Sequence, residues 1–323
     1  MRLRTVLIAF GSFLITLIIG IAWILSPVSR TSVPGIFSLQ TEKYGIEVSG
    51  TLAADRYIRN AEVFRWFFDI FSPKEKIRAG GYYLDRTMNA WQVYQKVTGT
   101  PDLLWITISA CLRKEQIGEI LAATLGWDPV EQEEWNGLYR TTQPEYVEGV
   151  YFPDTYLLPV DEPVDAIAQR FIDRFDENFA PFADYALQQD VQWTTALKIA
   201  SLIEREAAGP HDMALISGII WNRLNQGMRL EIDSTMQYTR GKVNGMWWAP
   251  VTLTEKRNDS PYNSYLHTGL PPTPICSPGI AAIEAALSPE ETECLFYLHD
   301  AKQNIHCSPT YQGHVRNIRE FLN

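Results

Sequence analysis

Two glutamates near the end of an apolar pattern of helical spacing are the first residues suited to acid–base chemistry. Residues 195–207 carry this pattern, and Glu204 and Glu206 lie near its C-terminal end. Side chains at i and i+2 of a helix point about 200° apart, so the two do not flank one substrate bond as a hydrolase's paired carboxylates do. Leu202 and Ile203 would give Glu206 an apolar wall, which raises a carboxyl pKa toward the range of a general acid. Periodicity alone supports Glu204 almost as well, and two solvent-facing glutamates are the commoner outcome.

Polar and aromatic side chains that could support such an acid or bind a substrate follow along the chain. They form two polar runs: Arg223, Asp233, Thr235, Gln237 and Tyr238, and then Asn263, Ser264, Tyr265 and His267. Between the runs, Trp247 and Trp248 could offer flat faces to sugar rings. Core packing is the more common role of tryptophan, and a turn or cap is a common role of aspartate.

Two consecutive helices are predicted around the glutamates. The first covers residues 195–207 and is stopped by Gly209-Pro210. The second runs from Asp212 as N-cap to Gly227 as the residue after its last turn. Their inward faces are predicted to hold Ala196, Ile199, Ala200 and Ile203, and Leu215, Ile216, Ile219, Ile220 and Leu224.

A long irregular segment separates these helices from a third. Residues 228–276 are rich in Gly, Pro, Asn, Tyr and Trp, and the third helix is predicted to begin with Ser277 as N-cap and Pro278 in its first turn. Loops longer than about 15 residues inside a compact domain are usually functional. The sequence therefore points to residues 228–276 as the place for a site.

The rest of the chain mixes short helices and strands, which predicts an α+β fold. Residues 54–71 and 89–97 have helical spacing, residues 106–109 are strand-like, and residues 113–125 form an amphipathic helix that ends at Gly126. The predicted parts are residues 1–30, a cytoplasmic stub with a membrane helix; residues 31–103, a stalk and a small domain; and residues 104–323, a larger domain whose core begins near residue 185.

Residues 6–25 are predominantly apolar and carry no charge, and a helix of about 20 such residues matches a hydrocarbon core of roughly 30 Å. Arg2 and Arg4 precede the segment, which places the N-terminus in the cytoplasm and the remainder outside. No A-x-A-like site follows, so a retained anchor is favoured over a cleaved signal peptide. We predict a single-pass protein of the inner (plasma) membrane that contacts the lipid bilayer through residues 6–25.

The amino-acid composition of the chain excludes some classes of function. The chain has 323 residues, 46% of them apolar and 20% charged, with 28 basic and 38 acidic side chains and a net charge of −10. This is a globular composition, and its acidic balance argues against a nucleic-acid partner. The sequence has no phosphate-binding glycine loop, no H-E-x-x-H and no dinucleotide-binding glycine motif, so neither a metal nor a cofactor is expected.

The four cysteines, Cys111, Cys276, Cys294 and Cys307, allow three pairings, and sequence cannot choose among them. Small buried side chains with at most one disulfide are the favoured interpretation.

Five blocks of sequence resemble one known family. They are EGVYFPDTY (148–156), ALKIASLIEREA (196–207), IIWNRLNQGMRLEIDSTMQY (219–238), SPYNSYLHTGLPPTPICSPGIAAIEAAL (260–287) and HCSPTYQGH (306–314). In order and separation they resemble the endolytic murein transglycosylases of the MltG/YceG family. The resemblance covers nearly all of the chain after residue 30, and residues 41–103 are similar to the family's LysM-like region.

The resemblance implies lytic cleavage of peptidoglycan glycan strands between N-acetylmuramic acid and N-acetylglucosamine, without a cofactor. It places the catalytic glutamate at Glu206, with Glu204 two residues earlier. The family usually has Thr or Ser where Ala207 stands here, so a hydroxyl contact would be lost or come from Ser201 or Thr235. It also implies partners among membrane-bound wall-synthesis proteins such as penicillin-binding proteins.

A lytic transglycosylase uses no water and needs one carboxyl group, which we assign to Glu206 as acid and then base. Asp233, Asn263 and Tyr265 are expected to hold the sugars, and Tyr238 to orient Glu206. Three alternatives stay open: a water-using muramidase with Asp233 as second carboxylate, a non-catalytic wall-binding scaffold, and a pyridoxal phosphate lyase, which a place outside the membrane disfavours.

Overall fold

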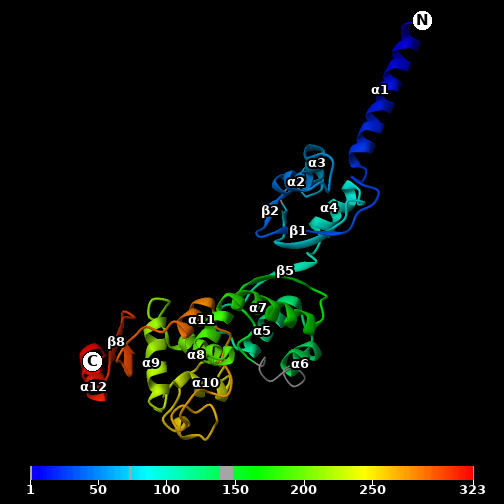
Figure 1. Cartoon of the computed structure of the whole chain (residues 1–323). Helices are drawn as coiled ribbons and strands as arrows, with labels where there is room; N and C mark the ends of the chain where they lie inside the picture. The colour runs from blue at the N-terminus through cyan, green and yellow to red at the C-terminus, as the bar shows by residue number, and fades with distance from the viewer. Residues whose placement is uncertain (1, 73–74, 139–147, 323) are drawn as a thin grey trace. The chain divides into compact units, whose positions relative to one another are not determined.

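The computed structural model describes residues 2–72, 75–138 and 148–322 (Figure 1). The described chain forms two compact units. One contains the residues up to Ile106 together with Tyr156–Glu162, and the other contains Thr107–Thr155 and the residues from Pro163 onward. Both helices and sheets are present, which confirms the predicted α+β fold.

The chain begins with helix α1, Arg2–Leu25, whose side chains Phe10, Phe13 and Trp23 are exposed. Among the residues that the structure describes, no helix combines the length and apolarity needed to cross a membrane. The membrane anchor predicted over residues 6–25 is therefore not confirmed.

The first unit is built on a four-stranded sheet in the order β1-β4-β5-β6. Its strands are β1 (Gly35–Leu39), β4 (Gly80–Leu84), β5 (Leu103–Thr107) and β6 (Thr155–Pro159). The remaining elements are β2 (Lys43–Tyr44), β3 (Lys76–Ile77), α2 (Gly45–Ala54), α3 (Ala61–Phe71) and α4 (Ala90–Thr98). Strand β1 pairs antiparallel with β4, from Gly35 opposite Leu84 to Leu39 opposite Gly80. Val48, Leu52, Phe64, Tyr82 and Val93 belong to the core of this unit.

The helical prediction over residues 54–71 is wrong in its first part. Residues 55–60 form a turn, and Asn60 caps α3 by accepting a hydrogen bond from the Val63 N–H at 2.9 Å. An asparagine N-cap satisfies a backbone donor that the helix leaves free, so the helix begins at Ala61 and not earlier.

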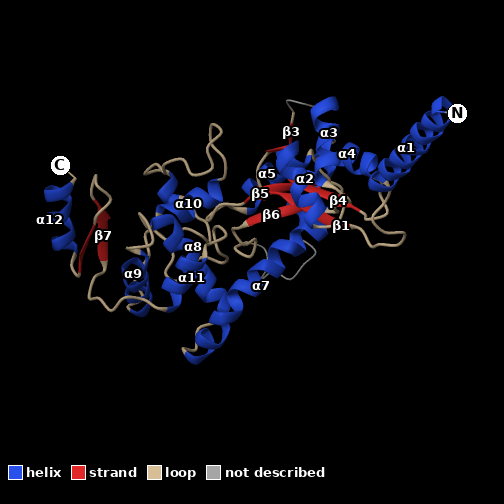
Figure 2. Ribbon diagram, turned by 90° about the horizontal axis from the view of Figure 1, so that it is seen from above, coloured by secondary structure: helices blue, strands red, loops and turns tan. Residues whose placement is uncertain are grey.

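The second unit is mainly helical. Its elements are α5 (Lys114–Leu125), α6 (Pro129–Gly137), α7 (Val164–Gln188), α8 (Trp193–Glu206), α9 (Met213–Asn225), α10 (Asp233–Arg240), the 3₁₀ turn η3 (Glu255–Arg257), α11 (Ile280–Leu287), β7 (Phe296–His299), β8 (Ile305–Ser308) and α12 (Tyr311–Phe321). Figure 2 shows α8 beside α10 and α11, and α8 also contacts α7 and α9. Helix α8 is therefore held by packing from several sides.

The helix that carries the two glutamates has the inward face that the sequence predicted. Ala196, Ile199, Ala200 and Ile203 are fully buried in the core of this unit. On α9, Ile216, Ile219 and Ile220 are buried, whereas Leu215 and Leu224 are only half-buried. Helix α5 ends before Gly126, which adopts a left-handed φ of 77°, as its place in the sequence predicted.

The start of the third helix differs from the prediction. Helix α11 has Gly279 as N-cap, because Ser277 is used elsewhere. The Ser277 N–H donates to the Leu112 carbonyl at 2.9 Å, and the Cys111 N–H donates to the Ser277 carbonyl at 2.8 Å. These two bonds form a short antiparallel bridge. Ser277 is extended in this bridge, so the helix begins after it.

Two disulfide bonds are present, so the expectation of at most one is wrong. Cys111 bonds to Cys276, and Cys294 bonds to Cys307. The bridge at Ser277 brings the first pair to a Cα–Cα distance of 4.7 Å. In the second pair, the Cα–Cα distance is 5.8 Å because Cys307 lies on β8, which pairs antiparallel with β7. Both distances are ordinary for disulfides.

Candidate active site

Glu206 is the last residue of α8, which ends there because Ala207 turns to an extended backbone conformation. The C-terminal end of a helix carries partial negative charge, which disfavours an ionised carboxyl group. The position of Glu206 at the end of α8 therefore disfavours the ionised form of its carboxyl group.

Two hydroxyl groups hold the Glu206 carboxyl. Ser234 Oγ donates to Oε1 at 3.2 Å, and Tyr297 Oη donates to Oε2 at 2.8 Å. Burial raises the pKa of Glu206, and the charge of Asp233 adds to this, whereas the two hydroxyls and Arg205 oppose it. The pKa of Glu206 is raised overall, as the apolar neighbours in the sequence predicted.

Ser234 and Tyr297 take the place of the hydroxyl donors that the sequence suggested. Ser201 Oγ donates to the Lys198 carbonyl at 2.8 Å and accepts from the Ile275 N–H at 3.1 Å. Thr235 Oγ1 is fully buried and donates to the Ile232 carbonyl at 2.8 Å. Both hydroxyls thus serve the backbone, and neither contacts Glu206 in this structure.

Glu204 lies on another side of α8. Its Oε2 accepts a hydrogen bond from the Gly279 N–H at 3.0 Å, at the start of α11. Burial raises its pKa, and the Gly279 hydrogen bond opposes this. The two glutamates therefore have separate surroundings, as their i and i+2 spacing predicted.

Asp233 is part of a charged cluster next to the acid, at the first position of α10 and beside Ser234. Tyr265 Oη donates to Asp233 Oδ1 at 2.6 Å, and Lys256 Nζ lies 2.8 Å from the same oxygen. Lys256 Nζ also donates to Tyr265 Oη at 2.8 Å. Burial, together with the Asp233 hydrogen bond, raises the pKa of Tyr265 to about 12, so it remains a donor. Asp233 is 46% exposed, which leaves its other oxygen accessible.

Asn263 uses its amide for backbone groups, contrary to the expectation that it holds a sugar. It is fully buried, and its Nδ2 donates to the carbonyls of Lys256 and Asn258 at 3.1 and 2.7 Å. Its Oδ1 accepts from the Tyr265 N–H at 2.9 Å. The amide therefore satisfies backbone groups of the loop that presents Lys256 and Tyr265.

Arg223 has a comparable positioning role. It is 8% exposed, and Nε donates to the Leu295 carbonyl at 2.6 Å while Nη1 donates to the Leu230 carbonyl at 2.6 Å. Leu295 comes directly before β7, the strand that carries Tyr297. Arg223 thus ties α9 to the strand that reaches the acid.

Tyr238 orients a different glutamate from the one expected. Its Oη donates to Glu148 Oε2 at 3.2 Å, and Tyr297 occupies the role toward Glu206. Glu148 is 2% exposed, and burial, with the nearby charge of Glu115, raises its pKa to about 8. Sequence reasoning missed this second acid, although it lies in the block at residues 148–156.

Both tryptophans of the long segment are half-buried against α5. Trp248 Nε1 donates to Gln116 Oε1 at 3.1 Å, and Trp247 Nε1 donates to Glu119 Oε2 at 3.2 Å. The Arg205 guanidinium lies over the Trp248 ring at 4.2 Å. Trp248 therefore stands next to the residue that precedes Glu206.

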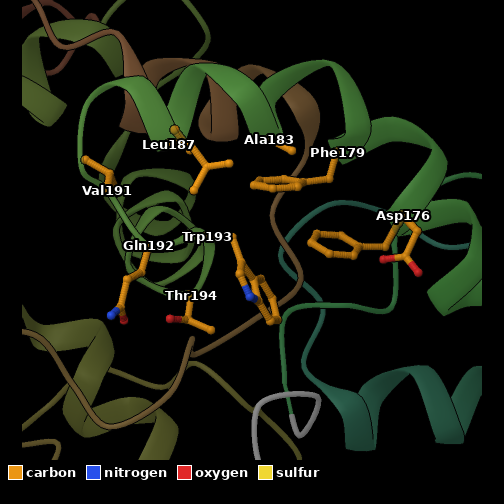
Figure 3. Close-up of a pocket in the computed structure, with 10 residues that line it drawn as sticks. Asp176, Phe179, Ala183, Leu187, Val191, Gln192, Trp193 and Thr194 are labelled. Atoms are coloured by element: carbon orange, nitrogen blue, oxygen red, sulfur yellow. The ribbon is translucent and has the colours of Figure 1, made fainter.

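A pocket of about 710 Å³ lies between α7 and the start of α8. Figure 3 shows the side chains that line it. Phe175, Phe179 and Trp193 line it, with Asp176 among its few polar side chains. This apolar pocket lacks an acid held by donors. Within the part of the chain that the structure describes, no group of three or more His, Cys, Asp or Glu side chains is arranged to hold a metal ion.

Among the site residues missed from the sequence, Ser234 adjoins the predicted Asp233 and Lys256 lies inside the predicted segment. Tyr297 is separated from Glu206 by 91 residues, and nothing in the sequence around it indicates that it contacts this glutamate.

Comparisons with known proteins agree with the resemblance found in the sequence. Residues 37–320 match the YceG-like family. An endolytic murein transglycosylase of Streptococcus pneumoniae strain D39 is 30% identical over 179 residues, which are 55% of this chain and 32% of the relative. One from Bacillus subtilis is 25% identical over 299 residues, 85% of this chain and 81% of the relative.

The crystal structure of a yceG-like protein from Listeria monocytogenes has a TM-score of 0.56 and 25% sequence identity, and the match covers 88% of this chain and 99% of that one. The chain spans about a third of the length of the pneumococcal relatives that it matches. The match over residues 37–320 covers most of the chain, and this chain therefore belongs to the YceG-like family.

Proposed function

We propose that this chain is a lytic transglycosylase that cleaves peptidoglycan glycan strands internally, between N-acetylmuramic acid and N-acetylglucosamine. The observation that carries the proposal is the carboxyl group of half-buried Glu206, which has a raised pKa and is held by two hydroxyl donors. A raised pKa lets this carboxyl group hold its proton to higher pH than an ordinary glutamate does, as a general acid requires. Membership of a family whose relatives are named endolytic murein transglycosylases supports the same reaction.

In the proposed first step, protonated Glu206 donates its proton to the glycosidic oxygen. The bond between C1 of the muramic acid and that oxygen breaks, and positive charge develops on the muramyl ring. In the second step, the Glu206 carboxylate removes the proton from the C6 hydroxyl of the same sugar. The C6 oxygen attacks C1 and closes a 1,6-anhydro ring, so no water is consumed and Glu206 is again protonated.

Tyr297 and Ser234 support both steps. Their hydrogen bonds favour the ionised form of Glu206, which exists only between the two proton transfers. Burial favours the protonated form that starts the cycle. The opposition of these effects suits a group that acts as acid and then as base.

A water-using muramidase would need a second carboxylate about 5 to 9.5 Å from the first. Asp233 is the candidate, but Lys256 and Tyr265 both contact its Oδ1. These contacts engage one oxygen of Asp233 and favour a supporting role for it beside Glu206. The reaction products separate the two mechanisms.

Placement in the inner membrane and contacts with wall-synthesis proteins, such as penicillin-binding proteins, belong to the same proposal. They rest on the sequence of residues 6–25 and on the family resemblance. Fractionation of cells that express the full chain and a form without residues 6–25 tests the first point. Equal release of both forms into the soluble fraction would contradict a membrane anchor.

The activity is tested by incubating the full-length chain with purified peptidoglycan and examining the glycans by mass spectrometry. We expect muramic acid ends one water lighter than reducing ends, and no such ends with Glu206→Gln. Glu204→Gln is the matched control, because it makes the same change on another side of α8, and it should still form anhydro ends. Ordinary reducing ends would show a hydrolase and bring Asp233 forward as its second carboxylate.

A further inference from the structure

Arg205 carries a guanidinium group without a polar partner. The structure gives it no hydrogen bond or ion pair to any described residue, and its Nε is buried without an acceptor. By contrast, Arg113 donates twice to Glu115, and Arg223 donates to main-chain carbonyls. Buried polar groups in proteins are almost always paired. Arg205 is therefore the arginine of this region that is left for a ligand.

The position of Arg205 points to the substrate. It directly precedes Glu206, and the Glu206 charge raises its pKa while burial lowers it more strongly, so the two groups interact electrostatically. Its guanidinium lies over Trp248, whose Nε1 donates to Gln116. A guanidinium stacked on an indole keeps its N–H edges free, and those edges match a carboxylate.

The chemistry of the glycan selects the group that Arg205 would bind. N-acetylglucosamine has no charge, whereas muramic acid carries a lactyl group. That group ends in a carboxylate on a peptide-free strand, or in a peptide stem that has carboxylates of its own. Both sources lie on the sugar whose C1 reacts.

We propose that Arg205, supported by Trp248, binds a carboxylate on the muramyl side of the scissile bond and so determines which strands are cleaved. This inference rests on the proposed function and adds a specificity residue to it. A charge-assisted, bidentate contact of this kind accounts for a roughly 10- to 100-fold preference for the charged substrate.

The same contact would act on the catalytic acid. The charged groups that face Glu206 are Arg205 on its own helix and Asp233 on α10, with Lys256 behind Asp233; Ser234 and Tyr297 are neutral donors. A bound carboxylate neutralises Arg205 and removes a charge that lowers the Glu206 pKa. Glu206 is then more fully protonated in the complex than in the free enzyme.

The test compares strands whose carboxylates are free with strands whose carboxylates are converted to methylamides. Peptide-free and stem-bearing strands are each used in both forms. For the wild-type chain, we expect amidation to lower kcat/KM by about tenfold or more in at least one pair, and that pair identifies the source of the carboxylate. On strands with free carboxylates, the kcat/KM of Arg205→Gln should be lower than that of wild type by the same factor. Amidation of the strands should not lower it further.

Arg205→Lys keeps the positive charge but cannot make the bidentate contact of a guanidinium. It should therefore retain part of the preference for strands with free carboxylates. Arg319→Gln is the matched control, because it removes an exposed arginine on α12 and should keep the full preference. Wild type that cleaves both members of each pair equally, or Arg205→Gln that still discriminates, would overturn the proposal.

Binding separates this inference from the proposed activity. Glu206→Gln, with and without Arg205→Gln, is titrated with the same strands by calorimetry. Weaker binding of amidated strands only when Arg205 is present supports the carboxylate site even if the wild-type chain forms no anhydro ends. Equal binding in all combinations refutes the site even if those ends are formed.

Discussion

Tyr297→Phe removes one hydrogen-bond donor from Glu206, the proposed catalytic acid, and leaves the aromatic ring in place. The hydroxyl donates to Glu206 Oε2 at 2.8 Å and so favours the ionised carboxyl. Hydrogen bonds to charged groups contribute about 1.5 to 3 kcal/mol, and 1.36 kcal/mol corresponds to one pH unit. The pKa of Glu206, already raised, should therefore rise further in this variant.

The sign of the effect on activity follows from the role proposed for Glu206 as the acid. The free enzyme must hold Glu206 protonated, so kcat/KM falls as the pH rises through the pKa of that group. In Tyr297→Phe this basic limb should move to higher pH by about 1 to 2 units. The maximal rate should fall by about tenfold, because the carboxylate formed during the reaction loses the same hydrogen bond.

The assay measures the formation of anhydro ends across a wide pH range for wild type, Tyr297→Phe and Tyr311→Phe. Tyr311 is 66% exposed on α12 and serves as the control for loss of a tyrosine hydroxyl. A basic limb that stays in place or moves to lower pH in Tyr297→Phe would refute the assignment of Glu206 as the group that titrates. An equal displacement in Tyr311→Phe would refute the specificity of the contact.

Two further predictions concern stability. The folded-state pKa of Glu148, about 8, exceeds the ordinary glutamate value of 4.5, so the folded chain binds the extra proton and the free energy of unfolding falls as pH rises between these values. Glu148→Gln should flatten this slope in urea unfolding, and an unchanged slope would contradict the burial argument. The Cys294–Cys307 bond closes a separation of 13 residues and the Cys111–Cys276 bond one of 165, so their loss should cost about 3 and about 5 kcal/mol. Urea titrations of the two double Cys→Ser variants with equal midpoints would contradict this order.

The parts of the site that the sequence predicts are those set by local geometry. Ile199 and Ala200 are buried because a helical period aligns them with the core, and the same period separates Glu204 from Glu206. Apolar neighbours one turn away indicated the raised pKa of Glu206. Each of these inferences needs only a few consecutive residues.

The parts that the sequence does not predict depend on tertiary contacts. Asn263 was expected to face a ligand, yet its buried amide satisfies the carbonyls of Lys256 and Asn258, because the irregular loop offers these carbonyls no regular backbone partners. Tyr238 was expected at Glu206, yet it lies one helical turn beyond Ser234 on α10 and reaches Glu148. Which glutamate each hydroxyl meets is decided by the packing of α10 on its neighbours.

The hairpin β7–β8 also determines when the acid becomes complete during synthesis. Chains emerge N-terminus first, and the 91-residue separation between Glu206 and Tyr297 must be made before the hydroxyl can reach the carboxyl. Cys307, opposite Tyr297 in the hairpin, is made later still, and its bond to Cys294 then fixes the strand. The helix that carries Glu206 is thus translated long before the acid has its full set of donors, and a nascent chain that stops short of β7 has the carboxyl without the tyrosine that supports it.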